Sequence, residues 1–363
     1  MKKGNGKHTW GRALLILGMC ACLALTGCSA KSEASKNTDK PADKDEIVIG
    51  MSFDSFVIER WIRDRNVFIS SAEKMGAKVN VQSANGDVEE QIKQIRYLIK
   101  QQVDVLVIIP VDCAALAEVV AEAKEAGISV ISYDRLILDG NEDLYISFDN
   151  EEVGTLMASN LKQALPEGGK LFLIGGPLTD ENVKQVEKGI NKELKDSNLE
   201  IVYTYRCDNW NAAAGYAAVK NALAQYPDVK GILCGNDDIA TQAFRALSEE
   251  RLAGDVLITG QDGDLMACQR IVQGTQLVTV FKSVEEEATV AAQYAVKLAK
   301  GTADLEALST IHNGNYDVPF LELTPVAVTV NNMENVIIKG GFHSEEEVYF
   351  VKEEETETTG EDD

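Results

Sequence analysis

The feature that most constrains the fold is a repeated alternation of two hydrophobic patterns from residue 47 onward. Short runs rich in β-branched residues alternate with amphipathic stretches that have a helical period. The short runs are apolar throughout instead of at every second residue, which is typical of strands buried on both faces. Repeated strand–helix–strand units of this kind predict an α/β fold with mostly parallel sheets and helices on both sides.

The pattern runs once through the first hundred or so residues of the globular part and then starts again. The predicted strands are 47–53, 77–83, 103–110, 129–134, 144–148, 170–176, 200–205, 229–235, 256–260 and 278–281. The predicted helices are 88–102, 114–126, 150–165, 182–196, 212–225, 239–252 and 284–300. This length exceeds one ordinary domain, so we expect two similar doubly wound lobes. A last β-rich piece, 319–338, is too small to be a domain, and we expect it to complete one of the two sheets.

Polar and aromatic residues follow most of the predicted strands. In open α/β sheets, ligands bind beyond the carboxyl ends of the strands, so these positions are the candidates for a site. They are Asp54, Arg60 and Trp61, then Asp134 and Arg135, Asp180 and Asn182, Asp208, Asn209 and Trp210, Asn236 and Asp237, Gln261 and Asp262, and Lys282.

This set of side chains suits a neutral polyol. Carboxylates accept hydrogen bonds from hydroxyl groups, Arg and Lys donate to them, and Asn does both. The apolar faces of a sugar ring stack on aromatic rings, and two of the three tryptophans, Trp61 and Trp210, follow predicted strands. Any one of these residues alone could be a helix cap or part of a surface salt bridge. The same chemistry at successive strand ends favours a shared binding site.

Several of these segments resemble a known family. They are 48–61 with Asp64 and Arg65, 81–86 (VQSANG), 103–110, Tyr133-Asp134-Arg135, 145–150 (YISFDN) and Gly260-Gln261-Asp262. Together they are similar to the type I periplasmic sugar-binding proteins of bacterial ABC importers, and within them to the xylose-binding branch. The resemblance covers roughly residues 47 to 301.

The resemblance implies a site and a ligand. A monosaccharide, D-xylose first, would lie between the two lobes, sandwiched by Trp61 and Trp210. Arg60, Asp134 and Arg135 would bind its hydroxyls from the first lobe. From the second lobe Asp180, Asn182, Asn236 and Asp262 would do so, and Lys282 would reach it from near the hinge. No catalytic residue and no cofactor is implied.

The resemblance also implies a hinge in which the chain crosses between the lobes three times. We place the crossings near Asp149, Ser283 and Thr310. The first lobe would then be 46–149 plus 283–309, and the second 150–282 plus 310–342.

The N-terminal residues read as a lipoprotein signal. Lys2, Lys3, Lys7 and Arg12 precede an apolar run, 13–25, that is too short to span a bilayer comfortably. Leu25-Thr26-Gly27-Cys28 then resembles a lipobox, so we expect cleavage of 1–27 and a lipid on Cys28. Residues 28–45, rich in Ser, Lys, Asp and Ala, predict a flexible tether. The expected location is the outer face of the bacterial cell membrane.

The chain is strongly acidic, with a formal net charge of −23. This charge argues against nucleic acid as a partner. Residues 343–363, which carry ten acids and one lysine from Glu345 on, predict a solvated, disordered tail.

The remaining cysteines and the histidines indicate neither disulfide bonds nor a metal centre. Cys113, Cys207, Cys234 and Cys268 form no CxxC pair, and we interpret them as buried free thiols. Three scattered histidines are too few for a metal site.

These features bear on four possible functions. The first is a lipid-anchored, monomeric binding protein that delivers D-xylose to an ABC permease. The second is a sensor of the same fold that docks on a membrane histidine kinase. A transcriptional repressor core would need an N-terminal helix-turn-helix and basic charge, which the sequence lacks. An enzyme is disfavoured because the sequence has no G-x-S-x-G, metal constellation or phosphate loop.

Overall fold

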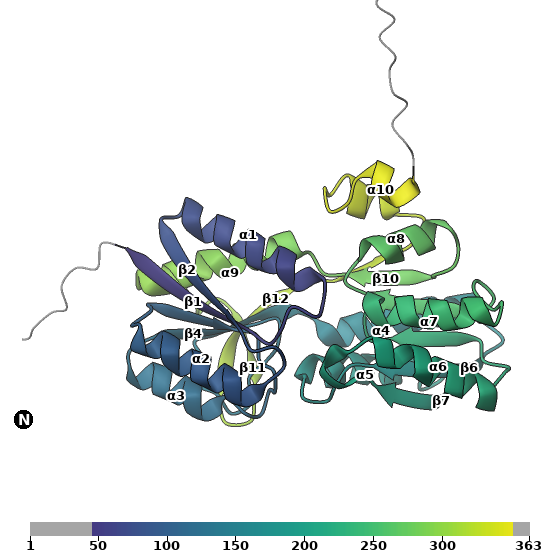
Figure 1. The fold of residues 1–363 in the computed structure, drawn as a ribbon, viewed down its shortest axis with the longest axis horizontal. Coiled ribbons are helices and arrows are strands. Elements are labelled where there is room, and N and C mark those ends of the chain that lie inside the picture. Colours follow the sequence, from purple (N-terminus) through teal and green to yellow (C-terminus); the bar gives the residue numbers. More distant parts are fainter. Residues whose placement is uncertain (1–45, 351–363) are drawn as a thin grey trace, which may run out of the picture. The chain divides into compact units, whose positions relative to one another are not determined.

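The computed structural model describes residues 46–350, which form two lobes, each built around its own sheet (Figure 1). The predicted signal peptide (1–27), the tether (28–45) with Cys28, and residues 351–363 of the predicted tail lie outside the described residues. The expected α/β fold with two doubly wound, mostly parallel sheets is confirmed.

The first lobe contains a seven-stranded sheet in the order β11-β12-β5-β4-β3-β1-β2. All neighbours pair in parallel except β11 and β12, which form an antiparallel hairpin at one edge. Its strands are β1 (Ile47–Phe53), β2 (Ala77–Ser83), β3 (Val105–Ile108), β4 (Ser129–Tyr133), β5 (Leu144–Phe148), β11 (Ser309–His312) and β12 (Asp317–Leu323). Its helices are α1 (Arg60–Lys74), α2 (Val88–Lys100), α3 (Ala117–Glu125) and α9 (Val284–Ala299).

The second lobe contains a six-stranded sheet in the order β13-β10-β9-β8-β6-β7, in which only β13 runs antiparallel to its neighbour. Its strands are β6 (Gly169–Gly175), β7 (Leu199–Arg206), β8 (Gly231–Cys234), β9 (Leu257–Gln261), β10 (Val278–Phe281) and β13 (Val326–Val328). Its helices are α4 (Asn150–Ala164), α5 (Glu181–Leu194), α6 (Ala213–Gln225), α7 (Asp237–Glu249), α8 (Leu265–Val272) and α10 (Glu345–Tyr349), with a 3₁₀ turn η1 (Asp208–Trp210) and a π-helical turn η2 (Glu334–Ile338).

Burial explains why the inner strands are apolar throughout. Every residue of β3, β5 and β10 is buried, because helices cover both faces of each sheet. Several helices, α4 and α9 among them, start at side chains that satisfy free backbone amides. Asp149 accepts from the amide of Glu152 at the start of α4, and Ser283 does the same for Glu286 at the start of α9.

These two caps are also crossing points between the lobes. The chain leaves the first lobe after β5 at Asp149 and returns after β10 at Ser283. The third crossing differs from the sequence-based prediction near Thr310. β11 and β12 both pair within the first sheet, and only β13 joins the second, so the chain crosses at residues 324–325. The first lobe therefore keeps β12, because this strand pairs along Tyr145–Phe148 of β5.

The C-terminal part departs from the prediction in two further ways. The β-rich piece expected over 319–338 is strand only as far as Val328 and then turns into the π-helical turn η2. The tail expected to be disordered from residue 343 begins instead with α10. A capping box between Ser344 and Glu347 starts this helix, and Val348 is buried against the second lobe.

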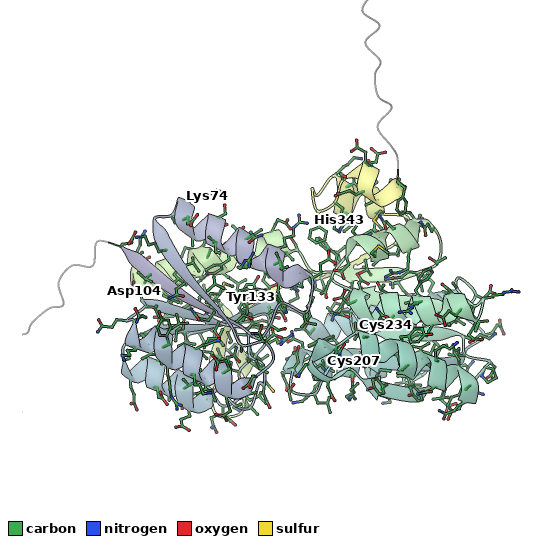
Figure 2. The ribbon with its side chains drawn as sticks, viewed as in Figure 1. Lys74, Asp104, Tyr133, Cys207, Cys234 and His343 are labelled. Carbon is green, nitrogen blue, oxygen red and sulfur yellow. The ribbon has the colours of Figure 1, made fainter. Side chains whose placement is uncertain are left out.

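The four remaining cysteines, Cys113, Cys207, Cys234 and Cys268, are free and buried, as predicted. Figure 2 labels Cys207 and Cys234, both in the second lobe near the ends of β7 and β8. Among residues 46–350, no helix combines the length and the apolar character that crossing a membrane requires.

A buried carboxyl group ties the β11–β12 hairpin to β4. Glu142 accepts a hydrogen bond from Ser132 Oγ (3.2 Å), and its carboxylate lies 3.5 Å from Nδ2 of Asn313 in the hairpin loop. The same Asn313 amide donates to the carbonyl of Gly140 (2.7 Å). Burial raises the pKa of Glu142 to about 7.

We expect Glu142→Gln to stabilise the protein at pH 8 but much less at pH 5. The folded protein holds the Glu142 proton more tightly than the unfolded chain does. The glutamate therefore costs stability as the pH rises from the ordinary glutamate pKa near 4.5 to the raised pKa near 7. A shift of this size corresponds to about 3 kcal/mol at most. Urea unfolding at the two pH values measures the difference. Glu118→Gln, at an exposed position, is the control, and equal effects of Glu142→Gln at both pH values would contradict the assignment.

Candidate functional site

A cavity of about 290 Å³ lies where the carboxyl ends of strands from both lobes meet. The structure brings all ten residues that the resemblance implies to its wall. They are Arg60, Trp61, Asp134 and Arg135 from the first lobe, and Asp180, Asn182, Trp210, Asn236, Asp262 and Lys282 from the second. Gln261, one of the strand-end candidates, also lines it, and so does Ile58, which the sequence did not indicate.

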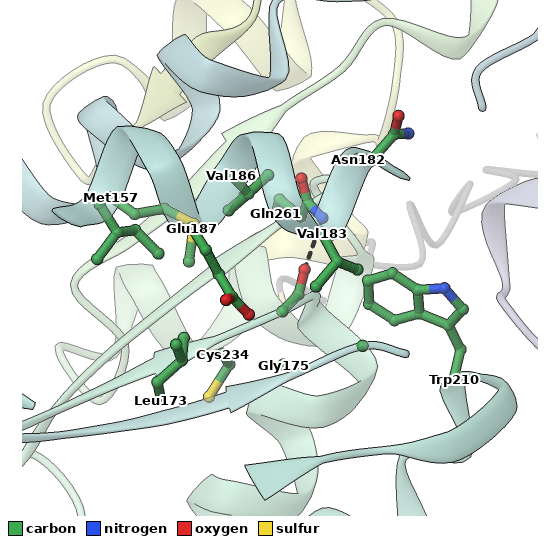
Figure 3. A pocket seen from close by; sticks show the side chains of 13 residues that line it. Met157, Leu173, Gly175, Asn182, Val183, Val186, Glu187, Trp210, Cys234 and Gln261 are labelled. Atoms are coloured by element: carbon green, nitrogen blue, oxygen red, sulfur yellow. Dashed lines mark hydrogen bonds between the residues drawn. The ribbon is translucent and has the colours of Figure 1, made fainter. Parts of the chain in front are cut away.

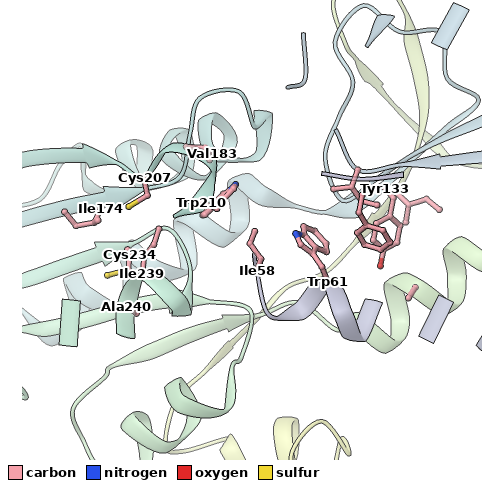
Figure 4. Packing of buried hydrophobic residues seen from close by; sticks show 14 of the residues in the cluster. Ile58, Trp61, Tyr133, Ile174, Val183, Cys207, Trp210, Cys234, Ile239 and Ala240 are labelled. Atoms are coloured by element: carbon pink, nitrogen blue, oxygen red, sulfur yellow. The ribbon is translucent and has the colours of Figure 1, made fainter. Parts of the chain in front are cut away.

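The two tryptophans face the cavity from different lobes. Trp61 lies in the first turn of α1, and Trp210 ends the 3₁₀ turn η1. Both rings are buried. Figure 4 shows them on either side of Ile58, which comes from the loop before α1. The cavity thus has an aromatic wall on each side, as a flat ring with apolar faces would require.

Arg60 is held by carboxylates on three of its nitrogens. Its Nε and Nη2 donate to Asp64 (3.1 and 3.0 Å), Nη2 also donates to Glu287 (2.6 Å), and Nη1 donates to Asp134 (3.2 Å). Burial alone would lower the pKa of Arg60, but these carboxylates raise it well above its ordinary value. The guanidinium is therefore fully charged and fixed in direction.

Arg135 joins the two lobes. Its Nη1 donates to Asp54 (2.8 Å) and to the carbonyl of Pro110 (3.1 Å) in the first lobe. Its Nε lies 2.7 Å from Oδ2 of Asp180 in the second. All three charged groups are buried.

Asp134 is the most heavily bonded residue of the site. Its carbonyl accepts from Ser147 Oγ (2.6 Å) and Tyr145 Oη (3.1 Å), and Asn182 Nδ2 donates to both the carbonyl and Oδ1 (3.0 Å each). Burial would raise the pKa of Asp134, but Lys282 and Arg60 lower it below the ordinary value. Asp134 is accordingly a carboxylate that bonds across the lobes.

Two second-lobe residues are both helix caps and site residues. Asp180 caps α5 by accepting from the amide of Asn182 (3.0 Å) through Oδ1, which leaves Oδ2 for Trp210 Nε1 (3.1 Å) and Arg135. Asn236 caps α7 through Oδ1, which accepts from the amide of Ile239 (2.9 Å). Its Nδ2 remains free to face the cavity.

Trp210 lies directly on a glycine. A Cβ atom at Gly176 would come within 2.4 Å of the indole ring, so only glycine permits this packing. Behind Trp210, a second, mostly apolar cavity of about 340 Å³ extends between α5 and the sheet (Figure 3). Gln261 lies between the two cavities and donates from Nε2 to the carbonyl of Gly235 (2.5 Å).

Asp262 and Lys282 complete the wall on the hinge side. Lys282 Nζ lies 3.3 Å from Oδ1 of Asp262 and 3.7 Å from Oδ2 of Asp134. These carboxylates raise the pKa of Lys282, although burial alone would lower it. The ammonium group is therefore charged in the cavity.

Six buried polar atoms that belong to residues of the cavity wall make no hydrogen bond among the described residues. Four are donors and two are acceptors: Trp61 Nε1, Arg135 Nε and Nη2 and Asn236 Nδ2, and Gln261 Oε1 and Asp262 Oδ1. Two of the six still lie close to an opposite charge, Arg135 Nε to Asp180 and Asp262 Oδ1 to Lys282. Buried polar atoms are normally paired, because each unpaired group costs about 1–3 kcal/mol. A mixed set of donors and acceptors around an aromatic-walled cavity suits a ligand with several hydroxyl groups.

The backbone at the site is unusual. Asp134, Trp210 and Asp262 have positive φ angles of 60°, 56° and 99°. Residues other than glycine seldom adopt this conformation, and they do so where the surrounding structure holds them in place. Here it turns each side chain towards the cavity.

Three carboxylates outside the cavity come close to one another. Carboxylate oxygen atoms of Glu59, Asp238 and Asp264 all lie within 4.8 Å of one another. The groups are exposed or only partly buried, and such clusters are common without an ion. We therefore assign no metal to them.

Comparison with known proteins identifies a family and relatives of this chain. Residues 49–303 match the family described as "Periplasmic binding protein domain". The chain is 41% identical to the "D-xylose-binding periplasmic protein" of Escherichia coli strain K12, over 92% of this chain and 98% of that protein. It is 43% identical to the protein of the same description from Haemophilus influenzae, over 85% of this chain and 94% of that protein.

A solved structure shares the fold. The solute-binding protein of an ABC transporter from Clostridium phytofermentans, with bound β-D-glucose, superposes with a TM-score of 0.75 at 26% identity. The match covers 83% of this chain and 99% of that one.

We expect Arg60→Met to lower the free energy of unfolding by about 3–5 kcal/mol. The substitution leaves Asp64 and Glu287 buried without their cation, which is the costly way to break a buried ion pair. Chemical denaturation measures the loss, and Arg245→Met, at an exposed arginine, is the matched control. Equal effects of the two substitutions would show that the buried network does not hold the first lobe together.

Proposed function

Because this chain belongs to the periplasmic binding protein family and is a sugar-binding protein and not an enzyme, we propose that it captures D-xylose in the cavity between its lobes. We further propose that it is exported, attached to the outer face of the cell membrane, and passes the sugar to an ABC permease.

The observation that carries the proposal is the set of unpaired donors and acceptors in the cavity. A sugar hydroxyl both donates and accepts, so it can bond Arg135 Nη2 or Asn236 Nδ2 and, through its own hydrogen, Asp262 Oδ1. Hydrogen bonds to charged groups contribute about 1.5–3 kcal/mol each. The rings of Trp61 and Trp210 supply the apolar faces on which a pyranose stacks.

The choice of D-xylose is supported by the relatives. Two relatives above 40% identity carry the name of this sugar.

The proposed mechanism is closure of the lobes on the sugar. Direct contacts already join the lobes in this structure: Arg135 to Asp180, Asn182 to Asp134, and the Cys113 amide to the carbonyl of Thr179 (2.8 Å). A ligand that bonds both lobes stabilises this arrangement relative to an open one. A permease that contacts both lobes would then distinguish loaded from empty protein.

Titration calorimetry with a pentose and hexose panel tests the proposal. We expect D-xylose to bind with micromolar or tighter affinity and to change the tryptophan fluorescence, since both described tryptophans line the cavity. Asp262→Asn should weaken binding at least tenfold by removing one charged acceptor. Asp228→Asn, on the exposed surface of the second lobe, should leave it unchanged. No binding of D-xylose at millimolar concentration would refute the proposal.

The attachment is tested separately at Cys28, which lies outside the described residues. In a host that processes lipoproteins, we expect the natural chain in the membrane fraction, labelled by a radioactive fatty acid, because a diacylglyceryl chain on Cys28 adds apolar surface. Cys28→Ser should be unlabelled and soluble. Identical fractionation of both chains, without label, would mean that no lipid is attached.

A further inference from the structure

The sugar-facing turn at Asp262 is held from behind by residues outside the cavity. Thr279 Oγ1 accepts from the amide of Gly263 (3.1 Å), and Cys268 Sγ lies 3.4 Å from the Gly263 carbonyl. Asp237 and His343 make the other contacts. Asp262 and Gly263 both have positive φ, 99° and 78°. Oδ2 of Asp237 accepts from the amides of Gly263 (3.0 Å) and Asp264 (3.1 Å). On the other side, Nε2 of His343 lies 2.8 Å from the carbonyl of Gly263. That carbonyl can only accept, so Nε2 carries the proton.

His343 belongs to the segment that the sequence predicted to be a disordered tail. We call residues 342–349 the C-terminal clasp. The clasp is anchored on α8, where Gln269 Nε2 donates to the carbonyl of Glu347 (2.8 Å) and Val348 is buried. Figure 1 shows α10 beside α8, and Figure 2 labels His343 at the start of this segment. The clasp is thus an ordered part of the second lobe.

The neighbouring residue Phe342 touches the other end of the same wall. Its ring packs edge-on against Phe281, with 4.7 Å between the ring centres. Phe281 is the residue before Lys282, and its ring also closes over Gly263, where a Cβ would lie only 2.7 Å from it. The clasp therefore supports both Asp262 and Lys282 from outside the cavity.

The clasp also reaches the first lobe. Arg63 on α1 donates from Nη1 to the carbonyl of Phe342 (2.7 Å), and its guanidinium lies 4.0 Å from the centre of the Phe342 ring. Arg63 is in turn paired with Glu285 at the start of α9. One short segment thus contacts a sugar-facing turn in one lobe and the helix that carries Arg60 and Trp61 in the other.

We propose that Phe342 and His343 are positioning residues for sugar binding, and that the C-terminal clasp holds the Asp262 turn in its binding geometry while it links the lobes through Arg63. This proposal rests on the proposed function of the cavity. A sugar-loaded site that lacks the clasp would release its ligand faster, because Asp262 would no longer be kept at its unusual φ angle.

The test compares two substitutions at His343 in the full chain. His343→Leu removes the donor, whereas His343→Gln keeps an N–H that can reach the Gly263 carbonyl. We expect His343→Leu to raise the Kd for D-xylose about tenfold, mainly through faster release in stopped-flow tryptophan fluorescence. We expect His343→Gln to recover affinity to within about threefold of the natural chain. His312→Leu, at an exposed histidine of the first lobe, is the control and should have no effect.

A second readout does not need the sugar. Hydrogen–deuterium exchange of the peptide that contains Gly263 and Asp264 reports whether their amides stay bonded to Asp237. We expect faster exchange in ligand-free His343→Leu than in ligand-free His343→Gln. The proposal for the clasp would be overturned if His343→Leu had the same affinity, release rate and hydrogen–deuterium exchange as the natural chain. If even the natural chain fails to bind D-xylose, the proposed function falls, and the exchange comparison still decides whether His343 holds the turn.

Discussion

The structure depends above all on pairing the charged side chains that it buries between its lobes. Arg60 has four carboxylates, those of Asp64, Asp134, Asp262 and Glu287, within 4 Å. Burial raises the pKa of the Asp64 and Glu287 carboxyls, while the neighbouring cations lower that of Asp134. Charges that are paired with one another can be held in fixed directions without water. A neutral ligand adds no charge to this network, whereas an ionic ligand would add a buried charge that needs a partner of its own. The electrostatics of the cleft thus favour an uncharged polyol.

Much of the fold could be predicted because its signals are local and repeated. Apolar strands and amphipathic helices alternate visibly, and parallel strands bring their carboxyl ends to one edge, so residues as distant as Trp61 and Trp210 could be expected to meet. The third crossing could not be placed, because a short antiparallel hairpin such as β11–β12 can pair with either sheet. Ile58 could not be predicted as a site residue, because it carries no polar group or ring that marks a site. α10 was not predicted, because its acidic residues are typical of a solvated tail. In the structure the buried side chain of Val348 anchors it.

Rigid backbone conformations connect the fold to the binding chemistry. Asp134, Trp210 and Asp262 adopt positive φ angles, and each is fixed by side chains from elsewhere in the sequence. Asn182 bonds Asp134 across the lobes, and Gly176 makes room for Trp210. A cavity prepared in this way loses little conformational entropy when it binds, which is a general route to affinity. The C-terminal clasp extends the same principle to a segment that never touches the cavity.

The most direct test of this account is a crystal structure of the chain grown with D-xylose. We predict density for one pyranose between the rings of Trp61 and Trp210. Its hydroxyls should lie about 2.7–3.2 Å from Arg135 Nη2, Asn236 Nδ2 and Asp262 Oδ1, three atoms that make no hydrogen bond among the described residues. Density for the sugar elsewhere, or a structure in which these atoms pair with one another and exclude it, would contradict the account.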